Sequence, residues 1–312
     1  MTEDRAFVLY SPAGESEIYR NDNLLSDSGG RLVFDGGIEI RPWLDTDYGR
    51  MTVPANGTPR QNYSMAVDKV AADFHDIHGK AVVCRQICGG FANFNLEAMA
   101  GKYFAGFEDM FCFAFYHPRY NYWMGASPEL LVEAIDGQHA RTRALAGTRP
   151  SSEHGAWDAK NLEEHTIVVK DICSRVSAIG DGWVAEPQPR GELPYGSIAH
   201  LCTPIIIQRE GDGDFPLGNV VKAIHPTPAV GGFPRAKALE AIKTLESAPR
   251  YYYGGVFTIP GCAYVMLRCV HFDRTHWCIY SGSGVTGESN SADEWIETEA
   301  KAKPLVDLLN SF

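Results

Sequence analysis

The sequence has no run of eighteen apolar residues, and no apolar stretch stands directly behind its polar start, Met1 to Asp4. A membrane-spanning helix needs about 20 apolar residues and a secretory signal needs an apolar core, so we expect a cytoplasmic protein with no membrane partner. Lys and Arg form no cluster, and the formal net charge is −11. Nucleic-acid binding requires a basic surface, so we expect no nucleic-acid partner.

Several common site motifs are also missing. The eight cysteines include no Cys-x-x-Cys pair and stand mostly in apolar segments, so we expect buried thiols rather than disulfides or zinc ligands. There is no phosphate-binding loop, and the glycine-rich stretch YSGSGVTG at 280–287 precedes no immediate helix, which makes it a poor dinucleotide fingerprint. Ser127 lies in ASPE rather than in a GxSxG elbow, which gives little support to a serine hydrolase.

What remains is a globular chain of 312 residues, 45% hydrophobic, in which no segment reads as a linker. We therefore expect one domain over 1–312, with strands in the first 60 residues. Helix periodicity places Met65, Val67, Val70, Ala71 and Phe74 on or near one helix face. Because helices interrupt the strands irregularly, the pattern favours an α+β fold. Strands are predicted at 80–87, 110–117, 121–126, 129–136, 139–147, 198–210, 252–259, 263–272 and 276–286, and helices at 61–78, 159–179, 234–245 and 292–309.

The loop at 225–233, HPTPAVGGF, combines prolines that fix the backbone with glycines and an alanine that leave space beside it. Such a loop suits close approach to a bound molecule. A rigid turn before the next helix explains the same residues, and from the loop alone it is the better explanation.

Acidic residues mark the starts of two predicted helices. Glu163 and Glu164 stand early in one helix, and Glu294 and Glu297 in the other, where a spacing of three puts the carboxylates on one face. Oxygen ligands of this kind suit Mg²⁺. A solvated acidic face is the alternative, and the spacing alone favours it.

A series of segments resembles, in the same order, the chorismate-utilising enzymes, and among them most closely the isochorismate synthases. The resemblance covers most of 80–312, the range that contains the core motifs. The strand region at 1–60 is shorter than is usual in that family. The segments are GKAVVCRQI (79–87), GASPELLV (125–132), ARTRALAGTRP (140–150), EEHTIVVKDI (163–172), HPTPAVGGFPR (225–235), YVMLRCV (264–270), YSGSGV (280–285) and EWIETEAK (294–301).

This resemblance implies an anthranilate synthase component I-like fold, with two antiparallel sheets flanked by helices around a deep cleft. It also implies a single chorismate-binding domain whose substrate is held through Mg²⁺, with Glu164 and Glu297 as metal ligands and Glu294 assisting. The residues that the resemblance assigns to substrate binding are Ala229, Tyr253, Arg268, Gly282, Gly284 and Lys301.

The implied reaction makes the chain an isomerase. A nucleophile adds at ring carbon 2 while a hydroxyl leaves carbon 4, and the ring double bonds shift between them. By resemblance, Lys80 activates the water and Glu129 protonates the departing hydroxyl. An ordinary lysine is charged at neutral pH, so Lys80 requires burial or nearby cations to act as a base.

Two positions favour water over ammonia as the nucleophile. Ammonia-using relatives lack the lysine at Lys80 and carry a larger hydroxylated residue at Ala229, so we expect no glutamine amidotransferase partner. Salicylate synthases share the lysine and the acid but differ at the loop, and they also eliminate pyruvate. Tyr253 does not separate these branches.

Three alternatives stay open: a salicylate synthase, an aminating enzyme, and a catalytically silent chorismate-binding module. A binding module of this kind would not need to keep both a proton donor and a proton acceptor. Asn161 stands where many relatives have a carboxylate near the metal, so weaker Mg²⁺ binding or a changed specificity is expected there. The sequence fits a monomer or a homodimer, and a role in siderophore, menaquinone or other secondary metabolism.

Overall fold

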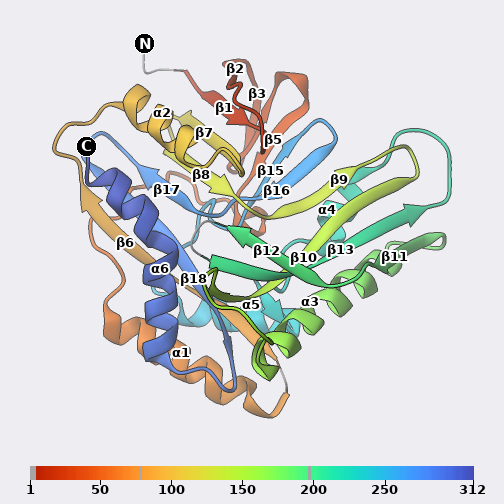
Figure 1. Ribbon diagram of the computed structural model, residues 1–312. Helices are drawn as coiled ribbons and strands as arrows, with labels where there is room; N and C mark the ends of the chain where they lie inside the picture. The colour runs from red at the N-terminus through yellow and green to blue at the C-terminus, as the bar shows by residue number, and fades with distance from the viewer. Residues whose placement is uncertain (1–4, 78, 196–197) are drawn as a thin grey trace.

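The computed structural model describes residues 5–77, 79–195 and 198–312. The expectation about a leader rests on Met1 to Asp4 and the predicted end of the first helix on His78, and both lie outside the described residues. The chain folds into two antiparallel sheets flanked by helices, which confirms the predicted α+β architecture (Figure 1). Within the described ranges, no helix combines the length and the apolar character that crossing a membrane demands.

The first sheet has eight strands and is built around a long central pair. Strand β6 faces β18 from Lys80 opposite Thr286 to Gly90 opposite His276, which places Val82 opposite Gly284. In spatial order the strands are β14 (Gly232–Phe233), β6 (Lys80–Gly90), β18 (His276–Thr286), β17 (Cys269–Phe272), β8 (Asn121–Ser127), β7 (Phe111–His117), β1 (Phe7–Ser11) and β2 (Tyr19–Asn21).

The second sheet extends into an arm of long strands. In spatial order it contains β11 (Trp183–Pro187), β13 (Ile198–Arg209), β10 (His139–Pro150), β9 (Leu130–Ala134), β16 (Cys262–Val265), β15 (Val256–Ile259), β5 (Ile38–Arg41), β4 (Arg31–Phe34) and β3 (Leu24–Ser28), and β12 (Gly191–Tyr195) pairs with β13 beside β11. The first 60 residues thus contribute strands to both sheets.

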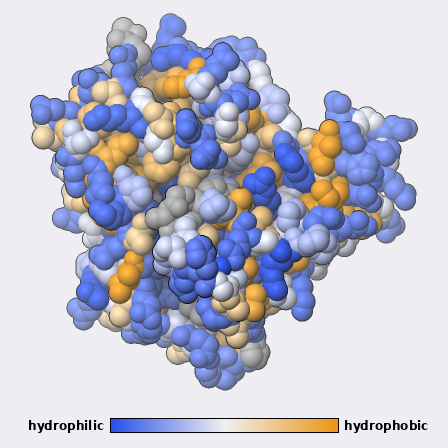
Figure 2. Space-filling view, in the orientation of Figure 1, coloured by the Kyte–Doolittle hydropathy of each residue, from blue (hydrophilic) through white to orange (hydrophobic). Residues whose placement is uncertain are grey.

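Apolar side chains fill the space between the sheets and the layers outside them. An aromatic core that includes Phe113, Trp123, Tyr252 and Phe257 draws residues from strands of both sheets. Helices α2 (Leu96–Gly106) and α6 (Ser291–Leu309) pack on the first sheet, α1 (Arg60–Phe74) and α5 (Arg235–Leu245) pack around β6, and α3 (Ala159–Ser177) and α4 (Leu217–Ile224) pack on the second sheet (Figure 1). Figure 2 shows that polar side chains cover most of the visible surface.

Side-chain caps fix where the site-bearing helices begin. The Asp158 carboxylate accepts a hydrogen bond from the Asn161 amide at 2.8 Å, and the Asn290 side chain accepts one from the Asp293 amide at 3.0 Å. Such caps satisfy backbone donors that have no partner within the helix. They place α3 and α6 within one or two residues of their predicted ranges, with Glu164 and Glu297 in the second turn.

The predicted strand at 263–272 is wrong as a single element. The chain leaves β16 at Val265, crosses to the first sheet over 266–268, and enters β17 at Cys269. Arg268 has a φ of 48°, in the left-handed region, which lets the backbone change direction there. The prediction failed because CAYV and CVHF are both mainly apolar, strand-favouring segments, and no glycine or proline in the sequence marks the break between them.

Other departures are smaller. The predicted strand at 252–259 begins only at Val256, after a turn, and the one at 129–136 begins after Glu129. Met65, expected on or near the core face of α1, is 63% exposed. The sequence analysis missed α2, α4, β11 and β12.

Candidate active site

A cavity lies where the two sheets and helices α3 and α6 meet. The strand β6, the connection from β8 to β9, strand β10, the loop before β14 and strand β18 all contribute to its wall. All the predicted catalytic and substrate-binding residues line it, together with two of the three predicted metal ligands. These residues are Lys80, Glu129, Glu164, Ala229, Tyr253, Arg268, Gly282, Gly284, Glu297 and Lys301.

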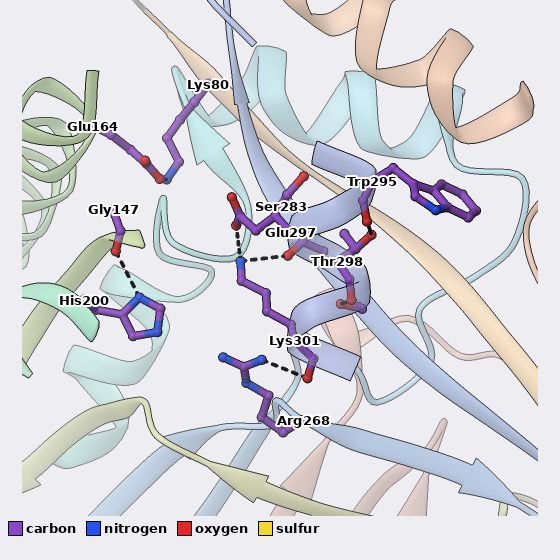
Figure 3. Close-up of polar contacts among 12 residues, drawn as sticks. Lys80, Gly147, Glu164, His200, Arg268, Ser283, Trp295, Glu297, Thr298 and Lys301 are labelled. Carbon is purple, nitrogen blue, oxygen red and sulfur yellow. Dashed lines mark hydrogen bonds and ion pairs between the residues drawn. The ribbon is translucent and has the colours of Figure 1, made fainter. Parts of the chain in front are cut away.

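Lys80 stands at the first position of β6 and is 1% exposed. Its Nζ donates a hydrogen bond to Glu164 Oε1 at 2.6 Å, which joins β6 to α3 (Figure 3). Gly284 of β18 gives this pair room, because a Cβ there would lie 2.8 Å from Glu164 Oε1 and 3.4 Å from Lys80 Nζ. The expected burial of Lys80 is present, but the charged neighbour is a carboxylate rather than a cation.

Glu129 lies between β8 and β9, where the chain passes from one sheet to the other, and it is 5% exposed. Its amide donates to Ser127 Oγ at 3.1 Å, and its carbonyl accepts from the Val265 amide at 3.0 Å. Burial raises the pKa of its carboxyl to about 7, against the opposing effects of Thr227 and Lys80. Glu129 can therefore hold and release a proton near neutral pH.

The opposite wall carries cations. Lys301 on α6 donates a hydrogen bond to the Gly282 carbonyl at 3.2 Å and forms an ion pair with Glu297 one turn earlier (Figure 3). The Arg268 guanidinium donates to the Lys301 carbonyl at 3.1 Å, and the Tyr103 hydroxyl donates to the Arg268 carbonyl. The crossing connection at 266–268 and helix α6 are thus fastened together at the cavity.

Charge in the cavity differs from charge over the whole chain. Its described lining residues include the basic side chains of Lys80, Arg268 and Lys301 and the carboxyl groups of Glu129, Glu164 and Glu297. His200, also in the wall, donates to the Gly147 carbonyl at 3.0 Å through Nδ1, and burial with nearby Arg268 and Lys301 lowers its pKa to about 4. His200 is therefore neutral at pH 7, and Arg268 and Lys301 are the cations that an anion would meet on this wall.

The predicted metal ligands are placed unequally. Glu164 and Glu297 line the cavity from α3 and α6, whereas Glu294 is buried, 3% exposed, and is not among the lining residues. Glu163 is exposed. Over the described part of the chain, no group of three His, Cys, Asp or Glu side chains is assembled for a metal. Two carboxylates of the right chemistry for Mg²⁺ face the cavity, so further ligands would have to come from water or a bound molecule.

Asn161 lines the cavity beside this wall. Its side-chain nitrogen, Nδ2, donates to Asp158 Oδ2 at 2.6 Å, so the side chain also belongs to the cap of α3. The loop at 225–233 lines the cavity through Ala229 and Val230.

Several lining residues were missed by the sequence analysis. Leu145, His200, Tyr280 and Leu305 come from β10, β13, β18 and α6. In the sequence each fits an ordinary strand or helix position. Only the tertiary arrangement brings them to one cavity, so no local signal distinguishes them.

A family model described as "Chorismate binding enzyme" matches residues 47–310. Isochorismate synthase MenF of Pasteurella multocida is 32% identical over 206 residues, which cover 60% of this chain and 46% of that protein. The vibriobactin-specific isochorismate synthase of Vibrio cholerae is 31% identical over 200 residues, or 59% of this chain and 49% of that protein. The chain spans about half the length of these curated relatives.

Solved structures share the fold. The putative 2,3-dihydroxybenzoate-specific isochorismate synthase DhbC of Bacillus anthracis has a TM-score of 0.73 at 22% identity, covering 98% of this chain and 84% of that one. MenF of Escherichia coli has a TM-score of 0.71 at 24% identity, covering 84% and 64%. Anthranilate synthase component I of Streptococcus pneumoniae has a TM-score of 0.66 at 18% identity, covering 83% and 61%. The predicted anthranilate synthase component I-like fold is confirmed.

Proposed function

Because the chain belongs to the chorismate-binding enzyme family, we propose that it is an isochorismate synthase, an isomerase that converts chorismate to isochorismate. One observation carries the proposal: a buried amine, Lys80 of β6, and a buried carboxyl, Glu129 of the connection from β8 to β9, line the same cavity beside Arg268 and Lys301. A reaction that takes a proton from an attacking water and gives one to a leaving hydroxyl requires such a pair.

We assign substrate binding to the cations of the cavity wall. Chorismate carries carboxylates, and Arg268 and Lys301 supply donors that pair with them. The peptide groups at Gly282 and Gly284 come close to the substrate because no side chain stands there. Tyr253 is buried in the wall and offers an apolar ring face.

Proton transfer is divided between the two buried groups. Lys80 Nζ takes a proton from the water that bonds to ring carbon 2. The bond from carbon 4 to its hydroxyl breaks as Glu129 donates its proton, so the hydroxyl leaves as water and the ring double bonds shift. One water enters and one leaves, which makes the net reaction an isomerisation.

Each group needs a particular protonation state. Glu129 is suited to donate because burial raises its pKa to about 7. Lys80 must carry a neutral amine when the water reacts, and its Nζ lies in hydrogen-bond contact with Glu164 Oε1 at 2.6 Å.

We also propose Mg²⁺ as the cofactor, with Glu164 and Glu297 as its protein ligands. Support comes from two carboxylates that face one cavity from separate helices, an oxygen donor set of the kind that Mg²⁺ prefers. When bound, Mg²⁺ would balance these charges and fix the ring carboxylate of chorismate. Asn161 supplies a neutral oxygen nearby instead of a third charge, which favours weaker metal binding.

Water is the proposed nucleophile, and we infer no glutamine amidotransferase partner. Ala229 lines the cavity with a methyl group and offers no hydroxyl to orient ammonia, while Lys80 supplies the base that water needs. A cytoplasmic location accords with a chorismate substrate.

Incubation with chorismate and MgCl₂, followed by chromatography of the products, tests this function. Isochorismate as the only product is expected. Salicylate with pyruvate would identify a salicylate synthase, an aminated ring would identify an aminating enzyme, and binding without turnover would identify a silent binding module.

A further inference from the structure

The buried side chain of Thr227 contacts the proposed acid, Glu129, and has no assigned role. Thr227, in the loop before β14, is 3% exposed, and its Oγ1 donates a hydrogen bond to Glu129 Oε1 at 3.0 Å. Thr227 is not among the residues that line the cavity. The Thr227 hydroxyl therefore acts on the reaction through Glu129.

The segment around Thr227 is held rigidly. Prolines at 226 and 228 fix the backbone dihedral on both sides of it, and the Thr227 carbonyl accepts from the amides of Val230 at 3.1 Å and Gly231 at 2.8 Å. The Arg250 guanidinium donates to the Val230 carbonyl at 2.9 Å. The hydroxyl is therefore presented from a fixed position.

Glu129 is held equally firmly from its own side. Its amide and carbonyl bond to Ser127 Oγ and to the Val265 amide. Two segments more than ninety positions apart in the sequence thus meet at one carboxyl, joined by a hydrogen bond whose partners are separated by 98 residues.

We propose that Thr227 is a positioning residue for the acid: its hydroxyl engages Glu129 Oε1, which fixes the carboxyl rotamer and leaves Oε2 as the oxygen that carries the proton. This inference rests on the proposed function, because it takes Glu129 to be the proton donor. It explains why a hydroxyl stands between two prolines in this loop. The residues of the loop that line the cavity, Ala229 and Val230, are apolar.

The hydrogen bond also affects the acidity of the carboxyl. A donor to the carboxylate favours the charged form, so Thr227 lowers the pKa of Glu129, and Lys80 on β6 acts in the same direction. Burial is the larger effect and raises the pKa. The other charged groups of the cavity wall are Glu164 on α3, Arg268 at the crossing connection, and Glu297 and Lys301 on α6.

Two substitutions separate positioning from packing. Thr227→Val keeps the shape and removes the hydroxyl, and Thr227→Ser keeps the hydroxyl and removes a methyl. We expect the valine variant to lose kcat by about tenfold or more, in line with the loss of a hydrogen bond to a charged group, with KM within about twofold. The pH at which kcat falls on the alkaline side should be higher in the valine variant. The serine variant should return both kcat and this pH to near the wild-type values.

A readout without substrate keeps this inference separate from the proposed function. The infrared carbonyl band of the protonated Glu129 carboxyl, identified by its loss in Glu129→Gln, is followed against pH in each variant. Its midpoint should rise in Thr227→Val and stay near the wild-type value in Thr227→Ser, whether or not chorismate is converted. If wild-type protein does not convert chorismate but the midpoint still moves, the proposed function fails and the hydrogen-bond role of Thr227 stands.

Equal loss of kcat in both variants with an unmoved midpoint would overturn the inference, because it would show that Thr227 only packs. An unchanged kcat and midpoint in the valine variant would do the same. Circular dichroism verifies folding, and Thr227→Ala takes the place of the valine variant if that variant does not fold.

Discussion

Lys80 reaches the cavity from β6 and Glu129 from the connection between β8 and β9, and both are almost completely removed from water. We expect Lys80→Ala and Glu129→Ala each to lower turnover by a factor on the order of a hundred or more, since each removes one of the two proposed proton-transfer groups. Stopped assays on variants with unchanged circular dichroism provide the measurement. Near-normal turnover in either variant would remove that residue from the mechanism.

The pH profile of the same reaction follows from the state of Glu129. The acid must be protonated, and burial raises its pKa to about 7. Wild-type kcat should therefore fall as the pH rises through about 7, and Glu129→Ala should lack this limb.

Glu164 and Glu297 offer a matched test of the metal. We expect Glu164→Gln and Glu297→Gln to need far more MgCl₂ for half-maximal activity, because a neutral amide is a weaker Mg²⁺ ligand than a carboxylate. Glu163→Gln is the control, since this neighbouring side chain is exposed. Wild-type activity that persists in excess chelator would contradict the metal site.

At the level of elements, β18 must pass close to the Lys80–Glu164 pair. In Gly284→Ala a new Cβ would stand 2.8 Å from Glu164 Oε1, so this flexible side chain must move away. We expect activity to fall severalfold or more while the thermal midpoint changes little. Gly101→Ala in α2 is the control, because a Cβ there meets nothing within 4 Å, and it should add about 0.5–1 kcal/mol of stability without affecting turnover. Full activity in Gly284→Ala would show that the pair is not needed.

Regular elements were predictable from the sequence because their signals are local. The predicted ranges of α3 and α6 lie within a few residues of the observed helices, and an apolar run located β6. Helix α2 was missed because its sequence, LEAMAGKYFAG, is apolar over most of its circumference and contains Gly101 and Gly106. The 263–272 strand was wrong because the change of backbone direction at Arg268 lies between two strands that are both mainly apolar in sequence.

The candidate site was predictable only in part, for a related reason. Motif resemblance found the charged residues, since these stand out in conspicuous segments. It did not find His200 or Leu305, which line the cavity only because β13 and α6 converge there. It also gave no indication that Lys80 would pair with Glu164, because a contact across 84 residues depends on how the two sheets bring α3 and the start of β6 together.

Over the whole molecule, an acidic chain surrounds a cavity that carries Arg268 and Lys301 in its wall. Long-range repulsion of an anionic substrate by a net charge of −11 is screened within about 8 Å at physiological ionic strength, whereas the cavity cations act at contact. The global charge and the substrate charge are therefore compatible.

Buried histidines should make the whole fold sensitive to acid. His271 is fully buried and His165 is 1% exposed, and burial lowers their pKa values to about 3 and about 4. The folded state keeps both histidines neutral, whereas in the unfolded chain they bind protons below about pH 6.5. Stability is therefore lost as the pH falls from about 6.5 toward 4. Each histidine contributes up to about 1.4 kcal/mol per pH unit to this slope.

Urea denaturation at several pH values provides the measurement. His271→Phe keeps an aromatic ring on Trp123, loses the hydrogen bond to the Tyr120 carbonyl, and should show a shallower slope than the wild type. His276→Gln, at an exposed position, should leave the slope unchanged. Identical slopes in all three proteins would show that the buried rings do not control acid stability.

The central claim is that water adds at ring carbon 2 of chorismate, and isotope labelling tests it most directly. Chorismate and MgCl₂ are incubated with the protein in ¹⁸O-labelled water, with and without an ammonium salt, and the products are separated and analysed by mass spectrometry and NMR. The account predicts isochorismate with the heavy oxygen on carbon 2 in both reactions. An aminated product when ammonium is present, or isochorismate without the label, would contradict it. Labelled salicylate with pyruvate would show the same water addition followed by elimination.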